Sequence, residues 1–181
     1  MDQVMMLLGL ESAEVTQIPQ RILLTAVMVL VLVWAVYGIR RSWRKKAIGQ
    51  ADIPVPNSVP IDFIAEQTFV GRYLASTYAN DWLKRIVVHG LGAPSRVVVD
   101  VSTLGIRMNF NQTREIFIPS ADISLVRADR AIAGRAFEKD GIAVILWKLG
   151  TTEIASGFRA DTSEDHARFL EMTISKQESG K

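Results

Sequence analysis

The sequence contains no cysteine and only two histidines, His89 and His166, among its 181 residues. Without a thiol, the chain forms no disulfide, thiolate metal site, iron–sulfur cluster or cysteine nucleophile. His89 has no acidic residue or second histidine close by in the sequence, as a catalytic triad or a metal site would need, and His166 fits an ordinary position at the start of a helix. We therefore expect no enzyme, no catalytic residue, no cofactor and no metal.

Net charge is also missing from most of the chain. Pro60 to Lys181 contains 15 basic and 15 acidic residues, so the whole net charge of +2 lies before residue 60. A nucleic-acid-binding domain usually carries a basic excess of its own. The charge distribution therefore predicts no nucleic-acid partner.

One long apolar run stands near the N-terminus, from Ile22 to Ile39, and it contains no charged residue. As a helix, its 18 residues would measure about 27 Å, close to the thickness of the hydrocarbon core of a bilayer. Pro19 stands where such a helix would begin, a position at which its missing N–H costs little. We predict a single transmembrane helix.

Three other interpretations of this run fit less well. A cleaved signal peptide has basic residues before the apolar run, whereas Asp2, Glu11 and Glu14 precede this one. A buried core helix or an amphipathic surface helix would have a polar face. Thr25 is the only polar side chain within the run.

The charges that flank the run predict its orientation. Arg21 alone precedes it, and five bases follow it: Arg40, Arg41, Arg44, Lys45 and Lys46. The positive-inside rule then places the N-terminus outside the plasma membrane and the C-terminal domain in the cytoplasm. The five bases form a typical stop-transfer flank, although they could also bind anionic lipid.

The predicted division of the chain into segments follows from the position of the transmembrane helix. Residues 1–18 would form a short segment outside the cell, and residues 19–46 the transmembrane helix with its basic flank. Residues 47–60 contain three of the six prolines and are predicted to form an extended spacer. Residues 61–176 would form the folded domain, and residues 177–181 a frayed tail.

The domain has the alternating pattern of short β-strands. Turn residues separate seven predicted strands, over residues 69–79, 96–101, 104–110, 114–118, 122–128, 142–149 and 152–159. The strand at 142–149 is apolar on both faces, so we expect it to be the most buried, with Trp147 in the core.

The chain then changes to a helical pattern, with Asp161 as the expected N-cap and Glu164 three residues later. Seven strands followed by one helix predict an α+β, mainly β fold, a sandwich or small barrel capped by the C-terminal helix. This is the pleckstrin-homology-like (PH-like) architecture.

The domain contains eight short motifs, which are Val70-Gly71-Arg72-Tyr73, Asp81-Trp82-Leu83-Lys84-Arg85-Ile86, His89-Gly90-Leu91-Gly92, Phe117-Ile118-Pro119, Ala121-Asp122, Asp129-Arg130-Ala131-Ile132-Ala133-Gly134, Leu146-Trp147 and Gly157-Phe158-Arg159-Ala160-Asp161. These motifs, together with the single N-terminal span, resemble a family of actinobacterial membrane proteins that carry a PH-like domain. Members of that family are often labelled transporters or export-related proteins, and it has no established catalytic residues to carry over. A single span without an internal charge does not form a transport pathway by itself.

Two segments offer candidate binding surfaces. The first contains Trp82, Lys84 and Arg85, which could form a loop for a partner or for lipid headgroups; alternatively, residues 80–86 form a short helical connection with Trp82 as a lid on the barrel. The second contains Arg127, Arg130 and Arg135, which could bind an acidic or phosphorylated ligand. Interleaved acids also fit a self-compensating, solvated loop there.

Together these features predict a membrane-tethered, non-catalytic adaptor at the cytoplasmic face, with a protein partner that the sequence does not identify. A sensor of lipid headgroups or small ligands, or an accessory subunit of a transport or export complex, remains the alternative. The balanced charge of the domain argues against charge-driven lipid binding.

Overall fold

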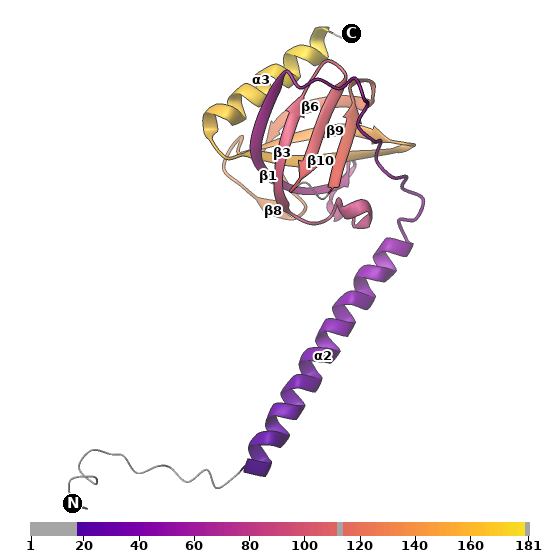
Figure 1. Cartoon of the computed structure of the whole chain (residues 1–181), viewed down its shortest axis with the longest axis vertical. Helices are drawn as coiled ribbons and strands as arrows, with labels where there is room; N and C mark the ends of the chain where they lie inside the picture. The colour runs from indigo at the N-terminus through magenta and orange to yellow at the C-terminus, as the bar shows by residue number, and fades with distance from the viewer. Residues whose placement is uncertain (1–17, 112–113, 180–181) are drawn as a thin grey trace, which may run out of the picture. The chain divides into compact units, whose positions relative to one another are not determined.

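The computed structural model describes residues 18–111 and 114–179, which form two compact units divided in the sequence between Arg44 and Lys45 (Figure 1). The predicted N-terminal segment, residues 1–18, lies outside the described residues apart from Ile18. The second unit contains all the strands and one further helix.

Helix α2 (Ile18–Ile48) contains the predicted span and continues past the predicted end at residue 46. It is long and apolar enough to cross a membrane by length and composition. All side chains from 19 to 46 are exposed. The hydroxyl of Thr25 donates a hydrogen bond of 2.8 Å to the carbonyl of Arg21, which satisfies the one polar side chain of the run within the helix itself.

The domain is built from antiparallel strands, and the seven that the sequence predicts are all present. They are β1 (Gln67–Tyr78), β3 (Ser95–Val101), β4 (Gly105–Phe110), β5 (Arg114–Pro119), β6 (Ile123–Asp129), β9 (Ile142–Leu149) and β10 (Thr152–Ala160). Their order in the sheet is β5-β4-β3-β1-β10-β9-β6. Three strands were not predicted: β2 (Asp81–Arg85), which pairs with β1, and the hairpin of β7 (Ala131–Ile132) and β8 (Arg135–Ala136).

Strand β1 belongs to both halves of the sheet, because it pairs with β3 along its first part and with β10 further on. Its register with β10 shifts between Tyr73 and Ser76, and such a bulge bends a strand and increases its twist. Gly71 permits the close approach of β1 and β10, since a Cβ atom there would lie 2.3 Å from the carbonyl oxygen of Arg159. The bulge and the close contact at Gly71 therefore allow the two halves of the sheet to fold toward each other around β1.

A chain of buried hydrogen bonds crosses the core. The hydroxyl of Tyr73 donates to the carbonyl of Leu91 over 2.8 Å, so it accepts from Ser76 at 2.7 Å. The Ser76 hydroxyl in turn accepts from Ser156 at 2.6 Å. The indole N–H of Trp147 donates to Ser156 over 2.9 Å. All four hydroxyl and indole groups are thus paired in one direction, as buried polar groups require.

Helix α3 (Ser163–Ser179) closes the domain and packs against β6, β9 and β10 (Figure 1). The ring of Phe169 is fully buried and contacts the rings of Phe69 and Phe158, at centroid distances of 5.3 and 5.0 Å. The helix also includes residues 177–179, which were predicted to belong to a frayed tail.

The predicted cap of this helix is wrong by one residue. The hydroxyl of Thr162 accepts a hydrogen bond from the backbone N–H of Asp165 over 3.1 Å and donates to its carboxylate over 2.8 Å. Thr162 is therefore the N-cap. Asp161, the expected cap, instead forms an ion pair of 2.8 Å with Arg96.

The predicted spacer also differs from expectation, because residues 50–63 pack against the domain; we call this segment the strap. The side chain of Gln50 is buried, donates to the carbonyl of Arg85 over 3.0 Å and accepts from the N–H of Val87 over 2.7 Å. Ile53 is 5% exposed and belongs to the main core cluster. The strap is therefore part of the domain and does not extend away from it as predicted.

Further along, the strap reaches the outer edge of β5. The carbonyl of Asn57 accepts a hydrogen bond from the N–H of Phe117 over 3.2 Å. The ring of Phe63 packs edge-on against that of Phe117, with centroids 5.7 Å apart. An exposed strand edge invites pairing with other chains, and the strap covers part of this one.

Candidate functional site

The six predicted binding side chains come from elements that the structure brings together. Trp82, Lys84 and Arg85 belong to β2, Arg127 to β6, and Arg130 and Arg135 to the segment of the β7–β8 hairpin. The N–H of Ala133, in the turn of this hairpin, donates to the carbonyl of Trp82 over 3.0 Å. The two candidate surfaces, separated by about 40 residues in the sequence, are therefore neighbours.

Residues 81–85 form neither the loop nor the short helix that the sequence suggested. They form strand β2, and the carboxylate of Asp81 accepts hydrogen bonds from the N–H groups of Leu83 and Lys84, at 3.0 and 3.2 Å. Trp82 is 52% exposed, so it is not a buried lid on the barrel. A large aromatic side chain held at the surface by a strand is a common anchor for binding.

Arg85 is the exception among the three candidates of β2, because its guanidinium is used within the domain. It donates to the carbonyl of Gly92 over 3.2 Å and to that of Ala133 over 3.0 Å. These bonds connect β2, the loop that follows it and the turn of the hairpin. Arg85 positions the surface, and we do not include it among the residues that face a partner.

The hairpin covers the outer face of β9 and β10. Ile132 is 2% exposed and packs over Gly157, where a Cβ atom would lie 2.9 Å from its Cδ1. With Leu74, Ile142 and Val144, it belongs to a second apolar cluster. This cover explains why β9 is apolar on both faces, as the sequence indicated.

The two-residue turn of the hairpin gave a signal that the sequence analysis missed. Ala133 and Gly134 have φ angles of 53° and 75°. Positive φ at both central residues is the geometry of a type I′ turn, in which glycine is favoured. Gly134 is the local signal for this hairpin, because alanine is not among the residues usually found at the first position of such a turn.

Beside the hairpin lies a cavity of about 290 Å³, which we call the hairpin groove. Its buried lining is Thr77, Ile132, Val144 and Ala155, and its more exposed lining includes Tyr78, Trp82, Arg127, Asp129 and Leu146. Apolar walls with a few polar groups are typical of ligand sites. The groove unites Trp82 and Arg127, one residue from each predicted surface.

The cation that lines the hairpin groove is already paired with an acid. The guanidinium of Arg127 lies 3.1 Å from the carboxylate of Asp129. The ammonium of Lys84 lies 4.6 Å from the centroid of the Tyr78 ring, within the range of a cation–π interaction. Arg130 and Arg135 are exposed but do not line the cavity.

One polar group of the groove has no partner. Thr77 is 1% exposed, and its hydroxyl oxygen forms no hydrogen bond with any residue of the described chain. A buried hydroxyl without a partner costs free energy, about 1–3 kcal/mol in proteins. One residue of the groove lining therefore carries an unused donor and acceptor, covered in the free domain, next to apolar walls.

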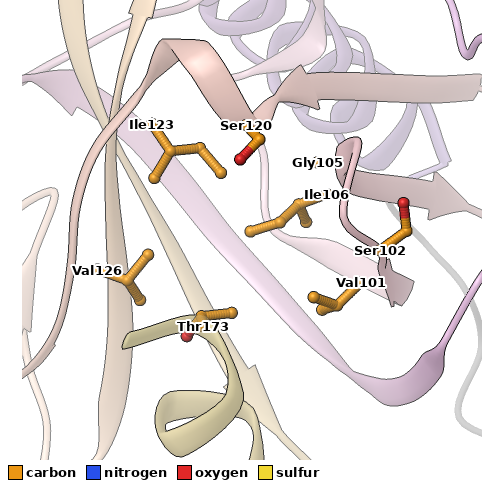
Figure 2. A pocket seen from close by; sticks show the side chains of 8 residues that line it. All are labelled: Val101, Ser102, Gly105, Ile106, Ser120, Ile123, Val126 and Thr173. Atoms are coloured by element: carbon orange, nitrogen blue, oxygen red, sulfur yellow. The ribbon is translucent and has the colours of Figure 1, made fainter. Parts of the chain in front are cut away.

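Two other cavities are less suitable for a ligand. Figure 2 shows the first, where Ile123, Val126 and Thr173 face the corner between β3 and β4. It measures only about 40 Å³, enough for about one water molecule or slightly more. The hydroxyl of Thr173 is also bonded, to the carbonyl of Phe169 over 2.7 Å.

The second is a concavity of about 470 Å³ on the outer face of β3 and β4. Its two arginines are paired with acids: Arg96 with Asp161, and Arg107 with the buried Asp100, each at 2.7–2.8 Å. Paired groups on an open face are typical of a solvated surface.

The histidines have structural contacts. The ring of His89 donates from Nε2 to the carbonyl of Ile53 over 2.8 Å, which helps to hold the strap. The ring of His166 donates from Nε2 to the carbonyl of Asp140 over 3.1 Å, and burial lowers its pKa. Burial also raises the pKa of the Tyr73 hydroxyl, which stays protonated in the core. Residues 18–111 and 114–179 contain no cluster of three or more potential metal ligands.

An antiparallel sheet in the order β5-β4-β3-β1-β10-β9-β6, followed by a closing helix, defines a PH-like domain. Residues 51–173 match the model of the bacterial PH domain-like family, and the chain belongs to that family. The match includes residues 51–60, which the sequence analysis assigns to the linker. No curated protein matches the chain. PH-like domains are generally non-catalytic binding modules.

Proposed function

We propose that this protein is a membrane-tethered, non-catalytic adaptor whose PH-like domain binds a protein partner through the hairpin groove. The observation that carries the proposal is the groove itself, in which exposed Trp82 stands beside apolar walls. Exposed tryptophan beside an apolar depression is a frequent centre of binding energy in protein interfaces.

The tether in this proposal is α2, oriented with its C-terminal end in the cytoplasm. Five bases follow the apolar run and one precedes it, as the positive-inside rule requires. Trp34, Tyr37 and Trp43 lie toward the basic end, where an aromatic belt would meet the interface. The five bases then serve as a stop-transfer flank, and any contact with anionic lipid would be secondary.

The charges of the domain favour a protein over an anionic headgroup. Arg127 is paired with Asp129 at the groove, and the domain from Pro60 onward has no net charge. A headgroup site needs unpaired cations that converge on a phosphate. A neutral groove with an aromatic edge suits an apolar or aromatic side chain of another protein.

Site-specific photocrosslinking in intact cells tests the proposal. A benzophenone amino acid replaces Asn80, an exposed residue of the groove lining, in one variant and Leu104 in another, so that Trp82 is kept in both. Leu104 is 39% exposed and lies outside the groove. We expect one discrete protein adduct from position 80 and none of the same mass from position 104.

A second pair of variants asks whether the groove is responsible. Ala155→Leu adds bulk to the buried lining and should weaken the adduct, whereas Val98→Leu, on β3, should leave it unchanged. Adducts with lipid alone would favour the headgroup sensor. Equal protein adducts from both positions, or adducts insensitive to Ala155→Leu, would contradict a docking role for the groove.

A further inference from the structure

The size and chemistry of the hairpin groove limit which side chain of the partner can enter it. This inference rests on the proposed function. The cavity of about 290 Å³ lies at the lower end of the sizes of ligand pockets. It is therefore suited to one large side chain and not to an extended ligand. Val144, Leu146 and Ala155 supply apolar lining, and Trp82 and Tyr78 supply aromatic surface.

Electrostatics disfavours a charged occupant. The one cation and the one anion of the lining, Arg127 and Asp129, are 3.1 Å apart and neutralise each other. A phosphate or carboxylate would have to compete with Asp129 for Arg127. An ammonium would have to compete with Arg127 for Asp129. A neutral group enters without breaking this pair.

A polar atom on the occupant is favoured by Thr77. Thr77 belongs to the lining of the groove, and its hydroxyl is buried and has no partner among the described residues. A purely apolar side chain would leave it unpaired. A side chain with an apolar body and a neutral hydrogen-bonding tip would satisfy it.

We infer that the hairpin groove binds a tyrosine side chain of the partner, with the phenol hydroxyl bonded to Thr77 and the ring against Trp82. The Thr77 oxygen is covered in the free domain, so a rim side chain moves when the phenol enters. Trp82 is half exposed, and its ring stacks on no other ring in the described part of the chain. We expect Trp82, which lines the same groove, to be the side chain that moves.

The test uses small probes on the full chain in lipid nanodiscs, with p-cresol as the tyrosine side chain and toluene as the phenylalanine side chain. Binding is followed by the NMR shifts of the Thr77 amide and the Trp82 indole N–H. Thr77→Val keeps the shape and removes the hydroxyl. It should raise the dissociation constant of p-cresol by about two- to tenfold, which corresponds to the net free energy of one hydrogen bond. The dissociation constant of toluene should not change.

Ser95→Ala is the matched control, because the Ser95 hydroxyl is also buried without a partner among the described residues and does not line the groove. This variant should bind both probes as the wild type does. Inorganic phosphate should cause no shift at either reporter.

Two results would overturn the inference: shifts of neither reporter with p-cresol, or equal weakening of both probes by Thr77→Val. A protein adduct at position 80 together with either result would leave the docking function standing with a different anchor. Binding of p-cresol without any adduct would instead contradict the docking function and leave the phenol site intact.

Discussion

Replacing Ser156 with alanine tests the buried hydrogen-bond chain of the core. Ser156 is 1% exposed and links the indole of Trp147 to the hydroxyl of Ser76. Ser156→Ala leaves the Trp147 N–H without an acceptor, at a cost of about 1–3 kcal/mol for a buried unpaired group. Ser76 still donates to Tyr73 but loses the bond that it accepts, which adds about 0.5–1.5 kcal/mol.

The expected loss is therefore about 1.5–4.5 kcal/mol, a large part of the 5–15 kcal/mol that stabilises a typical domain. Urea unfolding of the full chain in detergent, followed by near-ultraviolet circular dichroism, measures it. Combining Ser156→Ala with Trp147→Phe completes a double-mutant cycle. Because the phenylalanine ring has no N–H to leave unpaired, Ser156→Ala should cost less in that background.

Ser95→Ala serves again as the control, since its hydroxyl has no partner to lose among the described residues. It should leave the free energy of unfolding unchanged or raise it slightly. A cost for Ser156→Ala below about 0.5 kcal/mol, the usual range of neutral substitutions, would refute the directed chain. An equal cost for both alanine variants would refute it as well.

Two further predictions concern topology and pH. Since the chain has no native cysteine, Ser12→Cys and Ser179→Cys can be probed separately in intact cells with a membrane-impermeant maleimide. We expect labelling at position 12 only. Labelling at position 179 only would invert the proposed orientation. Burial lowers the pKa of His166 from its ordinary 6.5, and its Nδ1 is buried without a partner among the described residues. As the pH falls below about 6.5, the unfolded chain binds a proton that the folded chain does not, so stability should decrease. His166→Gln should make the unfolding free energy less sensitive to pH between 7 and 5, and an unchanged pH dependence in this variant would show that other groups control it.

The strands that the sequence predicted are those whose burial alternates or is complete. Ile106, Met108 and Phe110 of β4 are buried in turn, and this alternation is visible in the sequence. Strand β2 has no such pattern, because four of its five residues are exposed. Its conformation depends on hydrogen bonds to β1 and to Ala133, which local sequence does not encode.

The sequence failed to predict the helix cap and the groove for different reasons. Asp161 and Thr162 are both good capping residues, and pairing of Asp161 with the distant Arg96 decides between them. In the groove, Trp82 and Arg127 were selected as candidates because of their residue types. Their proximity depends on strand order, and Thr77 attracted no notice because an unpaired hydroxyl is a property of the folded state alone.

The strap sets the reach of the domain. A free spacer over residues 47–60 could have extended about 45–50 Å. Helix α2 instead ends at Ile48, and the first anchor of the strap, Gln50, follows two residues later. The chain between these two residues spans at most about 7 Å when fully extended. In the proposed function, a connection this short would keep the domain close to the bilayer and raise its effective concentration for a membrane-attached partner. The proposed adaptor would thus select partners first by their location at the membrane and then by their contacts in the groove.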